Sequence, residues 1–471
     1  MVKVSKFFLF NTLNREVEEL KPIHEGKISM YTCGPTVYGR AHIGNMRTYI
    51  NSDVLKRALI FAGYEVLQVM NVTDVGHLTS DSDEGDDKLQ MSAKKEKVSS
   101  WDVAKKYTDY FFEDEKELNI IRPSIVCEAT KHIKEQIALV KKLEVKGFTY
   151  KTSDGVYFDT SEFKDYGKLA KLNIEGLQAG KRIELGEKKN KTDFALWKFS
   201  KPDEKRDMEW DSPWGIGFPG WHIECSAMSM KYLGDTFDIH TGGIDHIPIH
   251  HTNEIAQAEC ATGKQFVKYW VHSEFLVLSD DAKMSKSLGN VLTVNTLMEK
   301  GYDPLAFRLL CLGTHYRKRL LFDENILIGA LNTFNSLKSK IIEIKSAIKG
   351  ELPEAKTVSG DNLKKFRESI FNDINTSVAL AEMWGVIRED SLKPEEKYSL
   401  LLEMDKVLGL NFEGMVAEKV VLSKEMKSLL NEREKFRKEK NWKEADRIRD
   451  EILSKGFTIK DTSVGPELVK K

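Results

Sequence analysis

Three short clusters in this 471-residue chain carry side chains whose types and spacing suit chemistry. The first is Cys33-Gly34-Pro35, followed by His42-Ile43-Gly44-Asn45. A helix that begins near His42 would turn its positive dipole end toward an anion, with His42 and Asn45 as donors on one face. Gly44 would let a planar ligand such as adenine lie against the backbone. The alternative is a His and an Asn that only cap a helix.

The second cluster is the run 281–290, which holds Lys283, Ser285, Lys286 and Ser287 between an Asp pair and a Gly-Asn turn. Such a loop can close over a polyphosphate, where ammonium groups offset the charge that builds on a leaving pyrophosphate. The alternative is an ordinary solvated surface loop. The density of Lys and Ser in five residues favours the phosphate interpretation.

The third cluster has the character of a metal site. His250 and Glu254 lie four residues apart and share one face if the segment is helical, and Cys225 lies upstream. Zn²⁺ accepts Cys sulfur, His nitrogen and carboxylate oxygen. Each residue also has a structural explanation, as a small buried hydrophobe, a core His or a solvated Glu. Spacing alone leaves zinc and a purely structural cluster open.

These clusters need a scaffold, and the segment 27–72 predicts one. Ile28, Met30 and Tyr31 form a strand-like stretch before a Gly34-Pro35 turn. A segment with helical spacing follows, and a second strand-like run covers 64–72. Strand, turn, helix and strand make the βαβ unit of a parallel sheet, in which ligands bind at the carboxyl ends of the strands.

The rest of the chain divides into regions of different pattern. Residues 101–147 have helical spacing, and 149–205 hold short strand-like pieces such as 156–158 among Lys- and Gly-rich turns, which indicates an insertion. The sheet pattern resumes near Gly220 and again at 236–240. Beyond Arg317 long segments with Glu/Lys faces predict an antiparallel helical bundle.

Composition narrows the class of protein. Lys+Arg number 72 and Asp+Glu 73, a net charge of −1, which argues against a highly basic coat protein or an acidic tail. The five cysteines are widely spaced and lack a CxxC pair, so reduced thiols are expected. The sequence has no apolar run long enough to span a bilayer and no signal peptide pattern. We therefore expect a cytoplasmic protein with no membrane contact.

Taken in order, the clusters resemble those of the cysteinyl-tRNA synthetases, a class I aminoacyl-tRNA synthetase family. The resemblance spans nearly the whole chain, and its order is more specific than any single motif. The matching runs are Cys33-Gly-Pro-Thr-Val-Tyr, the HIGH-type element 42–45, Asn71-Val-Thr-Asp, Gly220-Trp-His-Ile-Glu-Cys-Ser-Ala-Met, His250-His-Thr-Asn-Glu-Ile-Ala-Gln, Lys283-Met-Ser-Lys-Ser-Leu-Gly-Asn and Lys440-Asn-Trp-Lys-Glu-Ala-Asp-Arg-Ile-Arg-Asp-Glu-Ile.

The resemblance implies an α/β fold with a Rossmann-like parallel-sheet catalytic domain, an insertion, a helical bundle and a small anticodon-binding module. We expect the split catalytic domain at 1–125 and 205–265 and the connective insertion at 126–204. A stem-contact region that carries the KMSKS loop is expected at 266–317, the bundle at 318–411 and the C-terminal module at 412–471.

The family also implies roles for particular residues. One Zn²⁺ per chain would be bound by Cys33, Cys225, His250 and Glu254, while Thr73 and Trp221 would line the cysteine pocket. His222 is either an orienting neighbour of the metal ligands or a structural His. The residues implied for catalysis or for ATP, which would arrive with Mg²⁺, are His42, Gly44, Asn45, Gly243, Asp245, Lys283 and Lys286.

The implied zinc has a physical purpose, which is to tell cysteine from serine. An apolar pocket rejects an exchanged hydroxyl by only about a hundredfold, whereas protein synthesis needs roughly ten thousand. A metal-bound thiolate closes that gap, because a serine hydroxyl is a much weaker acid and a poorer ligand. The expected reaction joins L-cysteine and ATP to cysteinyl-adenylate, with transfer to the tRNA for cysteine as the second step.

The resemblance implies that the C-terminal region contacts RNA, whereas a basic helix of this composition is by itself more often a solvated face. Residues 421–471 hold 14 Lys+Arg and 10 Asp+Glu, a net charge of +4. Trp442 and Phe436 are candidates for stacking on anticodon bases, with packing inside a small helical module as the alternative for each. We expect a monomer.

Two departures from the family pattern stand out, and two rival functions remain. Asn45 replaces the usual second His, and the ending 461–471 lacks the usual Gly-Thr-Thr-Trp. The closest rival is a ligase that joins cysteine to a small amine, as in mycothiol-pathway relatives, but those lack the terminal module. The other rival is a zinc-containing RNA-binding protein without catalysis, against which His42 and the run 283–287 count.

Overall fold

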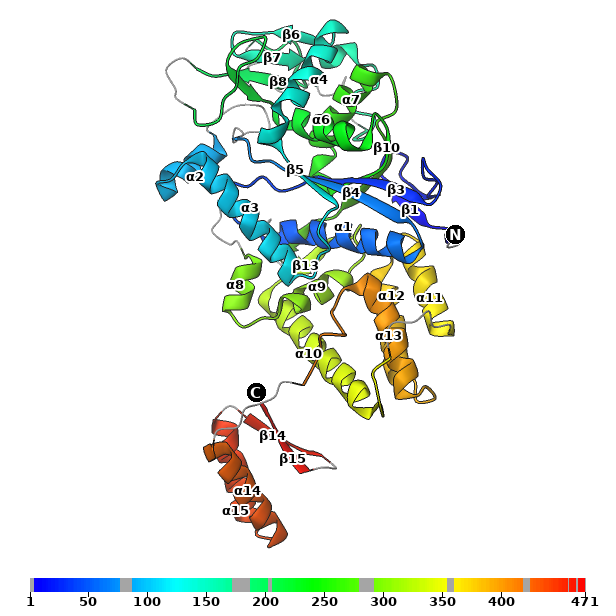
Figure 1. Ribbon diagram of the computed structural model, residues 1–471, viewed down its shortest axis with the longest axis vertical. Helices are drawn as coiled ribbons and strands as arrows, with labels where there is room; N and C mark the ends of the chain where they lie inside the picture. Colours follow the sequence, from blue (N-terminus) through cyan, green and yellow to red (C-terminus); the bar gives the residue numbers. More distant parts are fainter. Residues whose placement is uncertain are drawn as a thin grey trace. The chain divides into compact units, whose positions relative to one another are not determined.

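A computed structural model describes residues 4–76, 87–171, 187–201, 206–278, 292–353, 360–417, 424–455, 457–462 and 465–470. The chain divides into two compact units, Met1–Phe412 and Glu413–Lys471. Each unit is described separately below, and Figure 1 labels their elements.

The first unit is built around a five-stranded parallel sheet. β3 (Lys27–Thr32), the first predicted strand, lies at its centre. The predicted second strand is β4 (Glu65–Val72). The order is β11-β10-β3-β4-β5, with β5 at Ile125–Glu128, β10 at Phe237–Gly243 and β11 at Val267–Ser273. The α/β class predicted from the sequence is therefore confirmed.

Register brings three strand ends to one edge of this sheet. Thr32 lies opposite Met70 on one side and Thr241 on the other. The residues that follow these positions therefore meet at the carboxyl edge, where parallel sheets bind ligands. The helices α1 (Ile43–Phe61) and α6 (Trp221–Leu233) contact the sheet from opposite faces. Coverage on both faces agrees with the burial of the carboxyl-end residues of these strands, 30–32 in β3 and 68–72 in β4.

The sheet extends past two of the expected domain boundaries. β5 straddles the boundary expected between 125 and 126, and β11 lies inside the region 266–317. Both are edge strands of the sheet. The helical spacing on both sides of β5 gave no sign of these four strand residues. Only η3 (Ile244–His246) and α7 (His250–Thr262) separate β11 from β10 in the chain. The amino-acid composition does not change at the ends of these two strands, so it could not mark the boundaries.

The insertion contains the expected short strands. With β9, which lies beyond the expected end of the insertion at 204, they form a four-stranded antiparallel sheet in the order β6-β7-β8-β9. Their bounds are Thr149–Lys151, Gly155–Phe158, Phe194–Phe199 and Gly217–Pro219. The expected return of the main sheet near Gly220 is wrong, because β9 belongs to this second sheet and α6 begins at Trp221. The main sheet resumes at β10.

Further helices connect these sheets. α2 (Lys88–Glu96) and α3 (Ser100–Glu117) lie between β4 and β5 in the chain, and η1 (Ala129–His132) and α4 (Ile133–Val145) follow β5. Two 3₁₀ turns, η2 (Thr160–Glu162) and η3 (Ile244–His246), follow β7 and β10. At the start of the chain β1 (Phe8–Asn11) pairs with β2 (Glu16–Glu19).

Beyond the sheet the chain becomes mainly helical, as predicted. A short parallel pair, β12 (Leu276–Leu278) with β13 (Leu320–Phe322), precedes the bundle and was not expected. The helices are α8 (Val294–Glu299), α9 (Pro304–Leu312), α10 (Glu324–Ala347), α11 (Asp361–Phe371), α12 (Thr376–Arg388) and α13 (Pro394–Leu408).

The second unit is a helix pair with a hairpin. It consists of α14 (Lys424–Lys438), α15 (Trp442–Ser454), β14 (Phe457–Thr462) and β15 (Gly465–Lys470). Met426, Ile448 and Ile452 form its core. Among the helices that the structure describes in either unit, none has the length and apolar character needed to cross a membrane.

Candidate active site

A cavity of about 370 Å³ lies at the carboxyl edge of the parallel sheet. Its walls come from the loop after β3, the end of β4, the starts of α1 and α6, and the turn after β10. Nine of the predicted site residues line it: Cys33, His42, Asn45, Thr73, Trp221, Cys225, Gly243, Asp245 and His250. Residues separated by more than 200 positions in the sequence therefore share one chamber.

The four predicted zinc ligands converge at one side of this cavity. The ligand atoms of Cys33, Cys225, His250 and Glu254 all lie within 4.8 Å of one another, and all four residues are buried. The two sulfurs are 3.8 Å apart, and His250 Nε2 lies 3.0 Å from Glu254 Oε1. A tetrahedral zinc with sulfur bonds of about 2.3 Å sets its sulfurs about 3.8 Å apart. The donor set therefore fits such an ion.

The ionisable side chains of this cluster shift one another's pKa. Burial would raise the pKa of the Glu254 carboxyl, but His240 and His250 hold it well below its usual range. Burial lowers the pKa of His250, yet the charges of Glu254 and Cys225 bring it up to about 10. Burial, with the neighbouring Cys225, keeps the pKa of the Cys33 thiol well above normal. A divalent cation would relieve this competition by stabilising the deprotonated ligands.

A second set of donors overlaps the first. Cys33 and Glu254 also lie within 4.8 Å of His240 and His251, through ring nitrogens that are equally buried. His240 Nε2 is 2.9 Å from Glu254 Oε2, on the carboxylate oxygen that does not face His250. His251 Nδ1 is 2.7 Å from His272 Nε2. These His rings surround the predicted ligands and hold them in place, and sequence reasoning missed them.

His250 has a second neighbour that the sequence analysis did single out. Its Nδ1 lies 2.9 Å from His222 Nδ1, while its Nε2 faces Glu254. The indole of Trp221 packs on the same ring, with centroids 4.5 Å apart. His222 therefore lies where a residue that orients His250 would lie.

The opposite side of the cavity is the start of α1. His42 is the N-cap, and its Nδ1 accepts from the Asn45 N–H at 3.0 Å. In return, Asn45 Oδ1 accepts from the His42 N–H at 3.3 Å. His42 and Asn45 therefore do cap α1, as the alternative interpretation of these two residues expected. This arrangement also directs both side chains and the positive end of the helix dipole toward the cavity that they line.

The end of β10 and the turn that follows it supply two predicted site residues, Gly243 and Asp245. A Cβ at Gly243 would lie 2.3 Å from Asp245 Oδ1, so only glycine allows that carboxylate to fold against the backbone. Gly34 has a similar constraint, because a Cβ there would meet the Asn71 carbonyl oxygen at 1.6 Å. Gly44 is less constrained, with His42 Nδ1 at 3.0 Å from a Cβ position. Lys283 and Lys286 lie outside the described residues.

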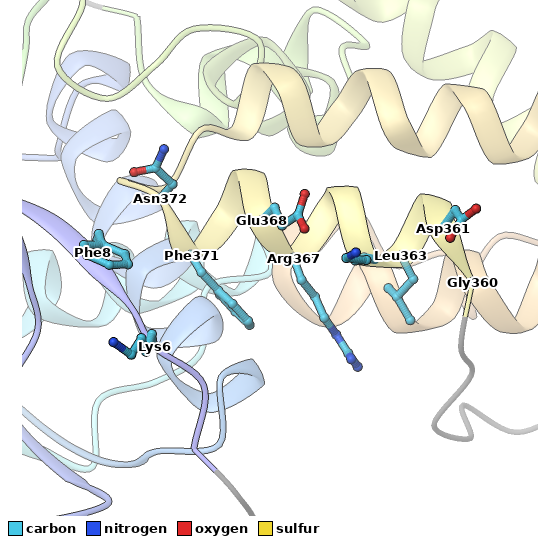
Figure 2. Close-up of a pocket in the computed structure, with 10 residues that line it drawn as sticks. Lys6, Phe8, Gly360, Asp361, Leu363, Arg367, Glu368, Phe371 and Asn372 are labelled. Atoms are coloured by element: carbon cyan, nitrogen blue, oxygen red, sulfur yellow. The ribbon is translucent and has the colours of Figure 1, made fainter.

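A larger hollow, of about 860 Å³, lies elsewhere in the first unit. Figure 2 shows its lining, in which Leu363, Arg367 and Phe371 of α11 face the same side, next to Phe8 and Lys6. None of the residues predicted for chemistry is part of this lining. The smaller cavity at the sheet edge is therefore the candidate active site.

Comparison with known families agrees with this assignment. The family described as tRNA synthetases class I (C) catalytic domain matches residues 19–332. Cysteine–tRNA ligase 1 of Burkholderia lata is 47% identical over 460 residues, covering 98% of this chain and 96% of that protein. The cysteine–tRNA ligase of Treponema denticola is 44% identical, covering 96% of this chain and 97% of its own length. The chain belongs to the cysteine–tRNA ligase family.

Membership extends to the terminal unit and agrees with the fold. The cysteinyl-tRNA ligase anticodon binding domain matches residues 420–465. Among solved structures, methionyl-tRNA synthetase of Mycobacterium tuberculosis in complex with methionyl-adenylate superposes with a TM-score of 0.55. That match covers 82% of this chain and 90% of that structure, at 13% identity, and shows the shared class I fold. The family makes this chain an aminoacyl-tRNA ligase.

Several residues that shape the site of this family member gave no sequence signal of their own. Asn71 and Glu224 lie in sequence runs that resemble those of the family, but nothing in their spacing indicated a contact with Thr73. In the structure, Thr73 Oγ1 donates to Glu224 Oε2 at 2.9 Å and accepts from Asn71 Nδ2 at 3.1 Å. Contacts between positions 151 residues apart follow from the fold, so periodicity along the chain cannot reveal them.

Proposed function

We propose that this chain couples L-cysteine to its tRNA in two steps, activation by ATP and transfer. Family membership supports the reaction. The observation that supports cysteine as the amino acid is the convergence of Cys33, Cys225, His250 and Glu254 on the wall of the active-site cavity.

These four residues would hold one Zn²⁺. When bound, the ion would take the substrate thiol as a thiolate and so favour sulfur over the oxygen of serine. The chain's own contribution is geometric, because His222 and Trp221 fix the ring of His250 while His240 fixes Glu254. A rigid donor set of this kind keeps its shape while the substrate exchanges.

Adenylate formation would take place between the start of α1 and the metal side of the cavity, which is the side formed by Cys33, Cys225, His250 and Glu254. His42 and Asn45 would donate to phosphate oxygens, and Asp245 would accept from the ribose. Gly44 and Gly243 would let the nucleotide approach the backbone, with Mg²⁺ bound mainly by phosphates and water. Lys283 and Lys286 would stabilise the pyrophosphate as it leaves. Positioning and charge then supply most of the rate enhancement.

The second step would use the terminal unit to hold the tRNA. Trp442, the first residue of α15, keeps 59% of its surface exposed, which supports stacking on a base. Phe436 packs against the core of this unit, which favours the structural alternative for that residue. A single chain supplies the residues proposed for both steps. We therefore propose that the protein acts as a monomer, in the cytoplasm.

Removal of the terminal unit tests this division of labour. A chain that ends at Phe412 should keep cysteine-dependent ATP–pyrophosphate exchange within about twofold, because every described residue of the cavity precedes that position. Charging of the tRNA should fall by roughly 100-fold, because phosphate and base contacts are lost. Equal loss of both activities would contradict the division. Exchange without tRNA charging by the full chain would favour the small-amine ligase.

A further inference from the structure

Glu224 is a buried carboxylate directly behind the wall of the active-site cavity. It lies in the first turn of α6, next to the predicted ligand Cys225, and its surface is fully covered. The positive end of the α6 dipole stabilises a negative charge at this position. Thr73 lines the cavity and donates its hydroxyl proton to Glu224 Oε2 at 2.9 Å. Glu224 therefore acts on the cavity through Thr73.

The donor and the acceptor can be assigned in each of the hydrogen bonds that link Gly34 to Glu224. The Gly34 N–H can only donate, and Asn71 Oδ1 accepts from it at 2.7 Å. That sets the Asn71 amide, whose Nδ2 donates to Thr73 Oγ1 at 3.1 Å. A hydroxyl has one proton and two acceptor positions. With the proton on the Glu224 side and one acceptor position filled by Asn71, Oγ1 can only accept from a ligand in the cavity.

The two ends of the cavity thus have opposite polarity. The start of α1 offers donors, His42 and Asn45, to phosphate and carboxylate oxygens. The end of β4 offers an acceptor, Thr73 Oγ1, with the charge of Glu224 behind it. An acceptor backed by a buried anion suits a cationic donor, and the cation that an amino acid carries is its α-ammonium group.

We propose that Glu224 is a positioning residue that makes Thr73 the acceptor for the α-ammonium group of the substrate. The inference rests on the proposed function and deepens it. The metal side recognises a thiol, and a thiol acid without an amino group carries the same sulfur and the same carboxylate. Glu224 and Thr73 disfavour such a compound, because it offers no donor to the remaining acceptor position of Thr73 Oγ1.

Three small thiols separate ammonium recognition from thiol recognition. Cysteine carries both charged groups, cysteamine keeps only the ammonium, and 3-mercaptopropionate keeps only the carboxylate. Their dissociation constants are measured by calorimetry on the zinc-loaded full chain, for the unmodified protein and for Thr73→Val, Thr73→Ser and Glu224→Gln. Zinc content is determined for each variant.

Thr73→Val and Glu224→Gln should each weaken cysteine and cysteamine by about 10- to 100-fold, the range for a hydrogen bond to a charged group. Both variants should leave 3-mercaptopropionate within about twofold, and Thr73→Ser should match the unmodified protein for all three thiols. Weakening of all three thiols alike, or of none, would overturn the proposal. If Glu224→Gln loses zinc or does not fold, equal binding of cysteamine by Thr73→Val and Thr73→Ser would still overturn the proposal.

Failure of this proposal can be distinguished from failure of the proposed function. Cysteine-dependent ATP–pyrophosphate exchange by the unmodified chain tests that function. Absence of exchange would reject the ligase, whereas exchange with unaltered thiol selectivity in the Thr73→Val variant would reject only the role of Glu224.

Discussion

The two sides of the active-site cavity are built on different physical principles. On the side of the predicted metal ligands, buried side chains from the loop after β3, from α6 and from α7 meet one another directly. On the opposite side, the cavity wall is the N-terminal end of α1. There the side chains of His42 and Asn45 form hydrogen bonds that cap the helix backbone. Under the proposed function, selection of the amino acid would depend on a rigid cluster, while nucleotide binding would depend on a helix dipole and the groups that approach it.

Loss of a metal-side ligand should have the largest effect. Cys225→Ser replaces a soft sulfur with a poor zinc ligand, so we expect loss of bound zinc and a fall of at least about 1,000-fold in cysteine-dependent exchange. Zinc analysis and exchange assays on the same preparation measure both. Cys311→Ser, at a buried cysteine of α9 outside the cavity, is the matched control. Full exchange activity without zinc would contradict the selector role.

A change on the α1 side should be milder and should spare the metal. Asn45→Ala removes one donor and one cap contact, so exchange should slow by roughly 10- to 100-fold. Zinc content and the dissociation constant for cysteine should stay unchanged. Asn51→Ala, on the same helix but outside the cavity lining, provides the control. Parallel loss of cysteine binding would show that the two sides are not separable.

The smallest effect concerns a carboxylate that supports α1 from outside the cavity. Glu254 on the metal side has His partners, whereas Glu115 Oε1 has no hydrogen-bond partner among the described residues. Burial, with the charge of Asp53, raises the pKa of Glu115 to about 8. The folded state therefore binds this proton more tightly than the unfolded state, and the free energy of unfolding falls as pH rises from about 4.5 to about 8.

Glu115→Gln should remove that part of the pH dependence. The variant should unfold with a free energy higher than that of the unmodified protein by on the order of 3 kcal/mol at pH 9, and by much less at pH 5. Urea titrations at both pH values measure this. The exposed Glu117 of the same helix gives the control Glu117→Gln. A constant difference between the two pH values would refute the pKa assignment.

Sequence reasoning was most successful where local pattern determines structure. The strand pattern of β4 and the shared helix face of His250 and Glu254 both express local geometry, and the structure forms these features. Local pattern could not indicate that Glu224 meets Thr73 or that His240 meets Glu254. The edge strands β5 and β11 were also missed, because their pairing partners rather than their own residues define them.

X-ray absorption at the zinc edge, with and without L-cysteine, tests the central claim most directly. Two sulfur ligands near 2.3 Å, from Cys33 and Cys225, are expected in the protein alone, and three after cysteine is added. Serine at the same concentration should leave the count at two. A sulfur count that stays at two in the presence of saturating cysteine would contradict selection of the amino acid through its thiolate.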